Sequence, residues 1–163
     1  MKTKTKLVIG VAAVTVVGVA LATPVVGLLA PLLAVGNHNA EMHARGTATT
    51  SSGELFRTEF ETEGPATLST QMSSVAPGGH NGWHSHPGIV FNTLISGSIE
   101  WYDENCTPTI YTAGDSWVEG SQLHAYRVIS TTANQAVSWF VTAQGQPLRT
   151  DLPAPPCAAA LGL

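Results

Sequence analysis

After residue 53 the chain is a series of short apolar runs separated by turn residues, and this pattern limits the fold more than any other feature. The runs are rich in β-branched and aromatic residues, which favour strands. No segment from 53 to 152 keeps an apolar period of 3.6 residues, so no helix is predicted there. The predicted strands are Glu54–Phe60, Ala66–Val75, Ile89–Ile95, Ser98–Tyr102, Thr109–Tyr111, Ser116–Val118, Tyr126–Ser130 and Ala136–Ala143. Short strands with close turns indicate an all-β sandwich or a closed barrel.

The N-terminus is apolar with a basic start. The lysines all fall in the first six residues, and the apolar run that follows contains the small-x-small stretch Ala20-Leu21-Ala22, which together are typical of a secretory signal. The run continues to Val35 and exceeds the roughly 20 residues that a membrane-spanning helix needs, so an uncleaved hydrophobic anchor helix is an equal alternative. Residues 1–36 are therefore interpreted as a signal peptide or a transmembrane anchor. Either interpretation predicts an extracytoplasmic protein, secreted or membrane-anchored.

The remaining segments differ in composition. Residues 37–52 are rich in Asn, Ala, Thr, Ser and Gly and are predicted to form a flexible linker. Residues 53–152 form the predicted barrel domain, and residues 153–163 a Pro- and Ala-rich tail that is expected to be irregular. The chain has two cysteines, Cys106 and Cys157. Exported proteins tend to pair their cysteines, so a disulfide between the tail and the barrel is predicted, with two separate buried thiols as the alternative.

The charge distribution excludes some partners. Three of the seven basic residues are lysines at the very N-terminus, whereas all eleven acidic residues follow Ala40. Nucleic acids and anionic membrane surfaces need basic patches. Neither is expected as a partner of the folded part, and the only membrane contact predicted is through an uncleaved N-terminal segment.

The histidines are the candidate metal ligands of the chain. His84-Ser85-His86 precedes a predicted strand, and in an extended chain residues two apart point to the same face. Neutral imidazole is the commonest metal ligand among side chains. The pair therefore indicates a metal site, although two surface histidines on a loop are the simpler alternative.

The neighbouring residues resemble the first sequence motif of the cupin family. That motif reads Gly, five residues, His-x-His, three or four residues, Glu, six residues, Gly. Gly78, His84, His86 and Gly97 fit it, but Val90 stands where the motif has Glu.

A second stretch resembles the second cupin motif, which reads Gly, five residues, Pro-x-Gly, two residues, His, three residues, Asn. Gly114 and His124 fit it if one residue is deleted from the turn, since His124 falls one position early. Gly120 and Gln122 replace the Pro and the second Gly.

The resemblance covers residues 53–152 and is closest to small exported single-domain cupins of actinobacteria. It implies a jelly-roll β-barrel in which His84, His86 and His124 bind one divalent metal, namely Fe, Zn, Cu, Ni or Mn. Asn92, which shares the strand parity of His84 and His86, is a candidate for a weak ligand or for a partner of the ligands, and Glu119 is a second candidate. By analogy, a homodimer is a further possibility.

Three functions remain open from the sequence, and no catalytic residue is assigned. The first is an extracytoplasmic metal-binding cupin of unassigned activity that takes a small-molecule ligand. The second is a metal-dependent enzyme of the dioxygenase or isomerase kind, acting on a small molecule. The third is a metal-free barrel with a binding role in the cell envelope.

Overall fold

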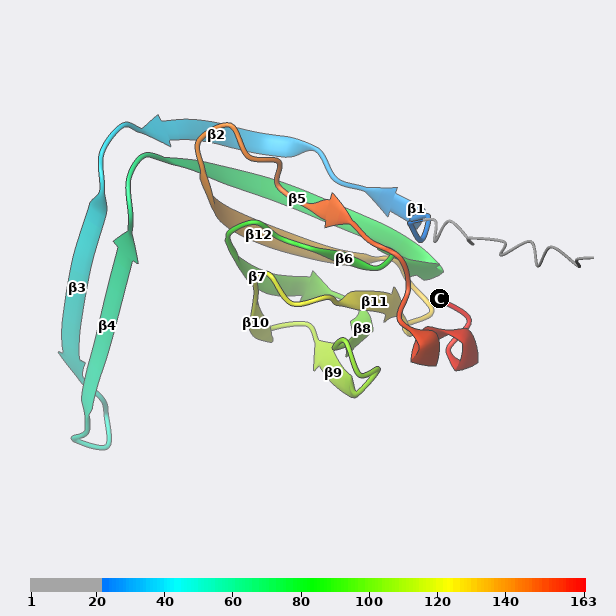
Figure 1. Ribbon diagram of the computed structural model, residues 1–163. Helices are drawn as coiled ribbons and strands as arrows, with labels where there is room; N and C mark the ends of the chain where they lie inside the picture. The colour runs from blue at the N-terminus through cyan, green and yellow to red at the C-terminus, as the bar shows by residue number, and fades with distance from the viewer. Residues whose placement is uncertain (1–21) are drawn as a thin grey trace, which may run out of the picture.

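The computed structural model describes residues 22–163, so the first part of the predicted signal or anchor lies outside the described residues (Figure 1). The described part is almost entirely β-structure. Its strands are β1 (Val26–Leu29), β2 (Leu32–His38), β3 (Met42–Thr49), β4 (Leu55–Thr62), β5 (Ala66–His80), β6 (His84–Ser85), β7 (Ile89–Ser96), β8 (Ser98–Tyr102), β9 (Pro108–Thr112), β10 (Ser116–Glu119), β11 (Ala125–Val128), β12 (Asn134–Ala143) and β13 (Thr150–Asp151). A short 3-10 helix, η1 (Pro156–Ala160), lies near the C-terminus.

The strands form a nearly closed antiparallel barrel of the jelly-roll type. The main sheet has the order β10-β7-β12-β5-β11-β8-β9, so that strands far apart in the chain lie side by side. The predicted strands correspond to β4, β5 and β7 to β12, with ends that differ by a few residues. The predicted all-β barrel is therefore confirmed.

The structure differs from the sequence prediction before residue 53. β1 and β2 occupy part of the predicted signal or anchor, and β2 and β3 occupy most of the predicted flexible linker. The physical reason lies in β5, which is 15 residues long. One edge of β5 pairs with β12 and the other would expose unpaired backbone groups. β1 and β2 satisfy that second edge, with Leu32 opposite Gln71 and His38 opposite Ala66. Among residues 22–163, no helix has the length and apolar character needed to cross a bilayer.

β3 and β4 form a hairpin that leaves the barrel. They pair with each other over their whole length, from Met42 opposite Thr62 to Thr49 opposite Leu55. The chain bends where it passes from β2 to β3 and from β4 to β5, so this hairpin projects from the body (Figure 1). We call residues 42–62 the arm.

The barrel interior contains two apolar clusters. The larger one includes Val75, Leu94 and Ile99, all fully buried. The smaller one joins Trp83 and Tyr102 to Ala158 of η1, so the tail is packed against the barrel rather than irregular throughout. A disulfide between Cys106 and Cys157 ties the tail to the β8–β9 loop, as the sequence predicts.

Candidate metal centre

The three predicted histidines converge at one end of the barrel. β6 begins at His84, which exchanges two backbone hydrogen bonds of 2.9 Å with His124. The backbone N–H of His86 donates to the oxygen of Gly120 at 2.9 Å. The loop before β11 is thus fixed to β6, and ligand atoms of the three histidines lie within 4.8 Å of one another. All three side chains are buried.

Each imidazole is held in the orientation that a metal requires. The Nδ1 atom of each ring lies within hydrogen-bond distance of a backbone carbonyl oxygen, which only accepts. Nδ1 must therefore carry the N–H, and in a neutral ring this leaves the lone pair on Nε2. The carbonyl partners of His84, His86 and His124 are Gly82, Leu148 and Gln122, at 2.8, 2.7 and 2.8 Å.

A carboxylate faces these lone pairs. Glu119 Oε2 lies 3.4 Å from His86 Nε2, and Glu119 Oε1 lies 3.5 Å from His124 Nε2. Both Nε2 atoms are buried, and neither has a hydrogen-bond partner. Acceptors that face one another in a dry site repel unless a cation lies between them. The residues present therefore fit a metal cation coordinated by three histidines and Glu119, and we call these four residues the metal centre.

Three side chains orient the Glu119 carboxylate. Its oxygens accept hydrogen bonds from Asn92 Nδ2 at 3.0 Å, Trp101 Nε1 at 2.8 Å and Trp117 Nε1 at 2.9 Å. Ser138 in turn donates to Asn92 Oδ1 at 2.6 Å, which fixes the amide so that its NH₂ group faces Glu119. The carboxylate is thus held in place before any ligand arrives.

The electrostatics favour an anionic Glu119 beside a neutral His84. Burial acts to raise the pKa of Glu119, but its interactions with the neighbouring His124 and His86 outweigh this effect and hold that pKa well below its usual range. Burial lowers the pKa of His84 to about 2, with smaller contributions from the neighbouring His124, Arg149 and His86. A neutral imidazole next to a carboxylate anion is the protonation state that metal ligation requires.

The carboxylate comes from β10, whereas the first cupin motif would place it on β7. In the β10–β7 ladder, Glu119 is the direct partner of Val90, the residue that stands where the first cupin motif has Glu. Val90 is itself buried. The structure therefore places a carboxylate beside the histidines from the strand that neighbours the expected one.

A small cavity reaches the metal centre from the barrel interior. Its volume is about 110 Å³, and it is bordered by His84, His86 and Glu119 together with polar groups such as Gln71 and Ser73. Pockets for drug-sized ligands are several times larger, so this cavity admits only a few non-hydrogen atoms.

The structure brings together all the residues predicted for the site, including Asn92 and Glu119. The two other histidines of the described N-terminal strands, His38 and His43, lie on β2 and β3 and are not part of it. Sequence reasoning missed the indole donors of Trp101 and Trp117. Trp117 shares a strand face with Glu119, a spacing that could have revealed it, whereas nothing in the sequence connects Trp101 to this site.

Several solved structures resemble the chain. One is an uncharacterized conserved protein with a double-stranded beta-helix domain from Klebsiella pneumoniae, at 24% identity over 52% of this chain and 76% of that chain, with a TM-score of 0.46. Another is an RmlC-like cupin from Shewanella frigidimarina, at 16% identity over 76% of this chain and 86% of that chain, with a TM-score of 0.45. A third is an oxalate oxidase, at 20% identity over 59% of this chain and 57% of that chain, with a TM-score of 0.45.

No curated protein matches the chain. Residues 71–141, however, match the family model of the cupin domain. This region contains the His84-Ser85-His86 stretch, Glu119 and His124. Residues 71–141 are therefore similar to the cupin domain.

Proposed function

We propose that the protein is an extracytoplasmic metal-binding cupin that holds one divalent transition metal on His84, His86, His124 and Glu119. The observation that carries the proposal is that hydrogen-bond acceptors, the Nε2 atoms and the Glu119 carboxylate, face one another in a buried site. Backbone carbonyls fix the Nε2 lone pairs inward, and the Glu119 carboxylate lies 3.4 and 3.5 Å from two of them. Mixed nitrogen and carboxylate ligands suit Fe(II), Zn(II), Cu(II), Ni(II) and Mn(II).

The test is the metal content of the purified protein without a histidine tag, measured by mass spectrometry of the elements. We expect about one metal per chain, lost in the variant His84→Ala/His86→Ala/His124→Ala. The matched control, His38→Ala/His43→Ala, removes two histidines outside the centre and should keep the metal. A wild-type protein that stays metal-free after incubation with all five ions would support the metal-free barrel instead.

The extracytoplasmic location rests on two features of the chain. Its N-terminus has the basic and apolar pattern of a signal or anchor. Its two cysteines are paired, and disulfides persist in oxidising compartments. The test is thiol alkylation in intact cells followed by a mass shift assay. Cys106 and Cys157 should resist alkylation until a reductant is added, and immediate alkylation in a cytosolic fraction would refute the location.

A second function, a metal-dependent enzyme, is favoured by the cavity beside the metal centre. A bound metal would supply Lewis-acid or redox chemistry at that point. The residues of the chain would confine the substrate, since the cavity of about 110 Å³ accepts only a small molecule and its polar wall, with Gln71 and Ser73, offers hydrogen bonds. Turnover of a panel of molecules with two to six non-hydrogen atoms, lost in Glu119→Gln, would select this function over binding alone.

A further inference from the structure

The arm has one apolar face and one charged face. Side chains alternate between the two faces of a strand, and the β3–β4 register places residues of equal character opposite each other. The apolar face consists of Met42, Ala44, Gly46, Ala48, Phe56, Thr58, Phe60 and Thr62. The other face holds every charged residue of the two strands, including an ion pair of 2.7 Å between Arg45 and Glu59. Such segregation is typical of a sheet that is solvated on one side and covered on the other.

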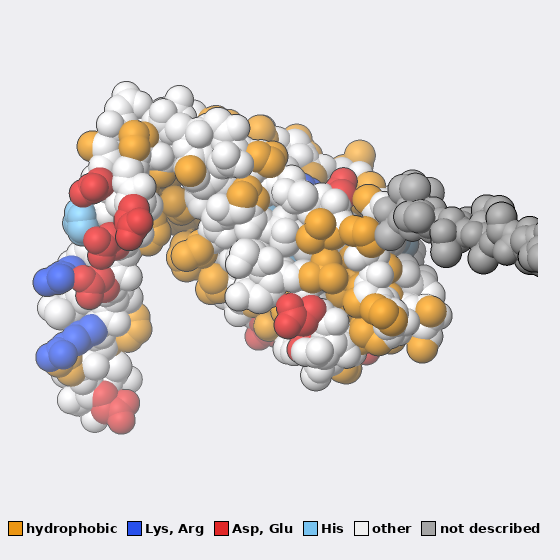
Figure 2. Space-filling model, viewed as in Figure 1, with side chains coloured by type: hydrophobic (Ala, Val, Ile, Leu, Met, Phe, Trp, Pro, Cys, Tyr) orange, Lys and Arg blue, Asp and Glu red, His pale blue; other side chains and the backbone are white. Residues whose placement is uncertain are grey.

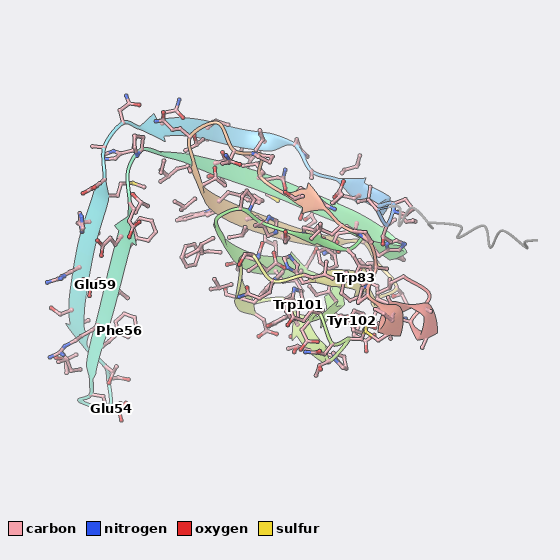
Figure 3. All side chains as sticks on the ribbon, in the orientation of Figure 1. Glu54, Phe56, Glu59, Trp83, Trp101 and Tyr102 are labelled. Atoms are coloured by element: carbon pink, nitrogen blue, oxygen red, sulfur yellow. A yellow bond between two sulfur atoms is a disulfide. The ribbon has the colours of Figure 1, made fainter. Side chains whose placement is uncertain are left out.

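The outer part of the apolar face of the arm is exposed, whereas Met42, Phe60 and Thr62 near its base are half-buried. Phe56 is 54% exposed, and Figure 2 shows open space between the arm and the barrel. The blue arginine side chains of the arm lie on the side turned away from the barrel (Figure 2). Phe56 and Glu59 are both far from the barrel residues Trp83 and Trp101 in Figure 3. A two-stranded hairpin without support is marginally stable in water, so the arm needs a covering surface.

A matching apolar surface lies on the outside of the barrel. Phe91 on β7 is the ladder partner of Val118 on β10 and of Trp139 on β12, so the three side chains form a row on the outer face. They are 43%, 60% and 63% exposed. The outward positions of β7, β10 and β12 carry no charged residue. We call this surface the outer face.

We propose that two copies of the protein form a dimer in which the arm of each copy covers the outer face of the other. A single copy, as described, leaves both apolar surfaces bare. A two-fold axis pairs arm with outer face twice, so both surfaces of both copies are covered without a third component. The charged face of each arm then remains in water.

The exposed aromatic side chains alone supply about half of the area that a stable dimer needs. An aromatic side chain buries roughly 150–250 Å², so Phe56, Phe91 and Trp139 leave about 300 Å² uncovered in each copy. The two-fold axis doubles this to about 600 Å², half of the roughly 1,200 Å² at which stable interfaces begin. Val118 and Ile89, which are 60% and 44% exposed, add apolar area to the outer face.

The first test is the mass of the purified full chain in solution, measured by light scattering at micromolar concentration. We expect twice the mass of one chain. Phe56→Glu on the arm and Trp139→Glu on the outer face should each give monomers, since both place a charge in the apolar contact. The matched control Thr47→Glu adds the same charge to the charged face of the arm and should stay dimeric. Circular dichroism and metal content check that each variant is folded.

A cross-link distinguishes an arm that covers the outer face of the second copy from an arm that folds back on its own barrel. In the variant Phe56→Cys/Val118→Cys, mild oxidation should yield a covalent dimer under denaturing conditions. A monomeric wild-type protein, an oxidised product that stays monomeric, or dimers that persist in both glutamate variants would each overturn the proposal.

Discussion

Glu119 on β10 lies directly opposite Val90 on β7, and this pairing explains how a chain that lacks the glutamate of the first cupin motif still presents a carboxylate to its histidines. Direct partners in an antiparallel ladder point to the same face of the sheet. A carboxylate at either position therefore reaches the interior near His86. The site keeps an anionic group although the residue that usually supplies it is absent.

Glu119→Gln should weaken metal binding. The substitution keeps the shape of the side chain and its contacts with the indole N–H groups but removes the negative charge. We expect the dissociation constant of the metal to rise at least tenfold, measured by competition with a chelator of known affinity. The control is Glu100→Gln, which removes a carboxylate that binds Arg127 instead of the histidines. Equal affinities in the wild type and Glu119→Gln would exclude Glu119 from the ligand set.

Adding Val90→Glu to Glu119→Gln should restore part of the lost affinity. The new carboxylate would enter the same interior face from the opposite strand. Recovery should be partial, because the network of Asn92, Trp101 and Trp117 is built around Glu119. The measurement is the same chelator competition. Val90→Gln added to Glu119→Gln is the control, since its side chain has a similar volume but no charge. No difference between these two double variants would contradict the equivalence of the two positions.

Metal binding should change the fluorescence of Trp101. Its indole ring stacks on His124, with ring centroids 5.7 Å apart and planes inclined by 21°. Cu(II) or Ni(II) bound to this histidine would lie close enough to quench the indole. Titration of the metal-free protein should therefore lower the emission, and Trp101→Phe should remove much of the response. Trp139→Phe, on the outer face, is the control, and an unchanged response in Trp101→Phe would argue that the ion binds elsewhere.

Removal of the disulfide should destabilise the fold and leave the metal centre intact. Cys106 and Cys157 are 51 positions apart, and the chain-entropy model gives about 4 kcal/mol for a loop of this length. Cys106→Ser/Cys157→Ser should lower the free energy of unfolding in urea by 2–5 kcal/mol, to order of magnitude. Metal content should stay near the wild-type level, and a variant of unchanged stability would show that the tail packs independently of the disulfide.

Alkaline unfolding should depend on Tyr102. Burial and its hydrogen bond to Glu100 raise the pKa of Tyr102 to about 12 from 10.0. The unfolded chain therefore loses this proton first, and the contribution of the neutral tyrosine to stability is lost as pH rises through this interval. In Tyr102→Phe the free energy of unfolding should fall less between pH 10 and 12 than in the wild type. Parallel curves from urea titrations would contradict this assignment.

Much of the fold and part of the site could be read from local sequence. Apolar and β-branched runs between turn residues predicted β7 to β12, and in β7, β10 and β12 exposed positions alternate with more buried ones along the strand. His84 and His86 share a face for the same reason. Residues 37–52 could not be assigned correctly, because their small polar composition lacks a strand signal. Part of this stretch forms the end of β2 because it pairs with the free edge of β5. Another part forms β3 because it pairs with β4.

The sequence by itself determined the all-β barrel, the histidine set and the candidate disulfide, since these depend on residue type, parity and cysteine count. Only the tertiary structure decided that Glu119 faces His86 and His124, that Trp101 orients it, and that the arm stands away from the barrel. These features depend on ladder register between strands distant in the chain. Register is set by the packing of the whole sheet, and no local pattern of residues encodes it.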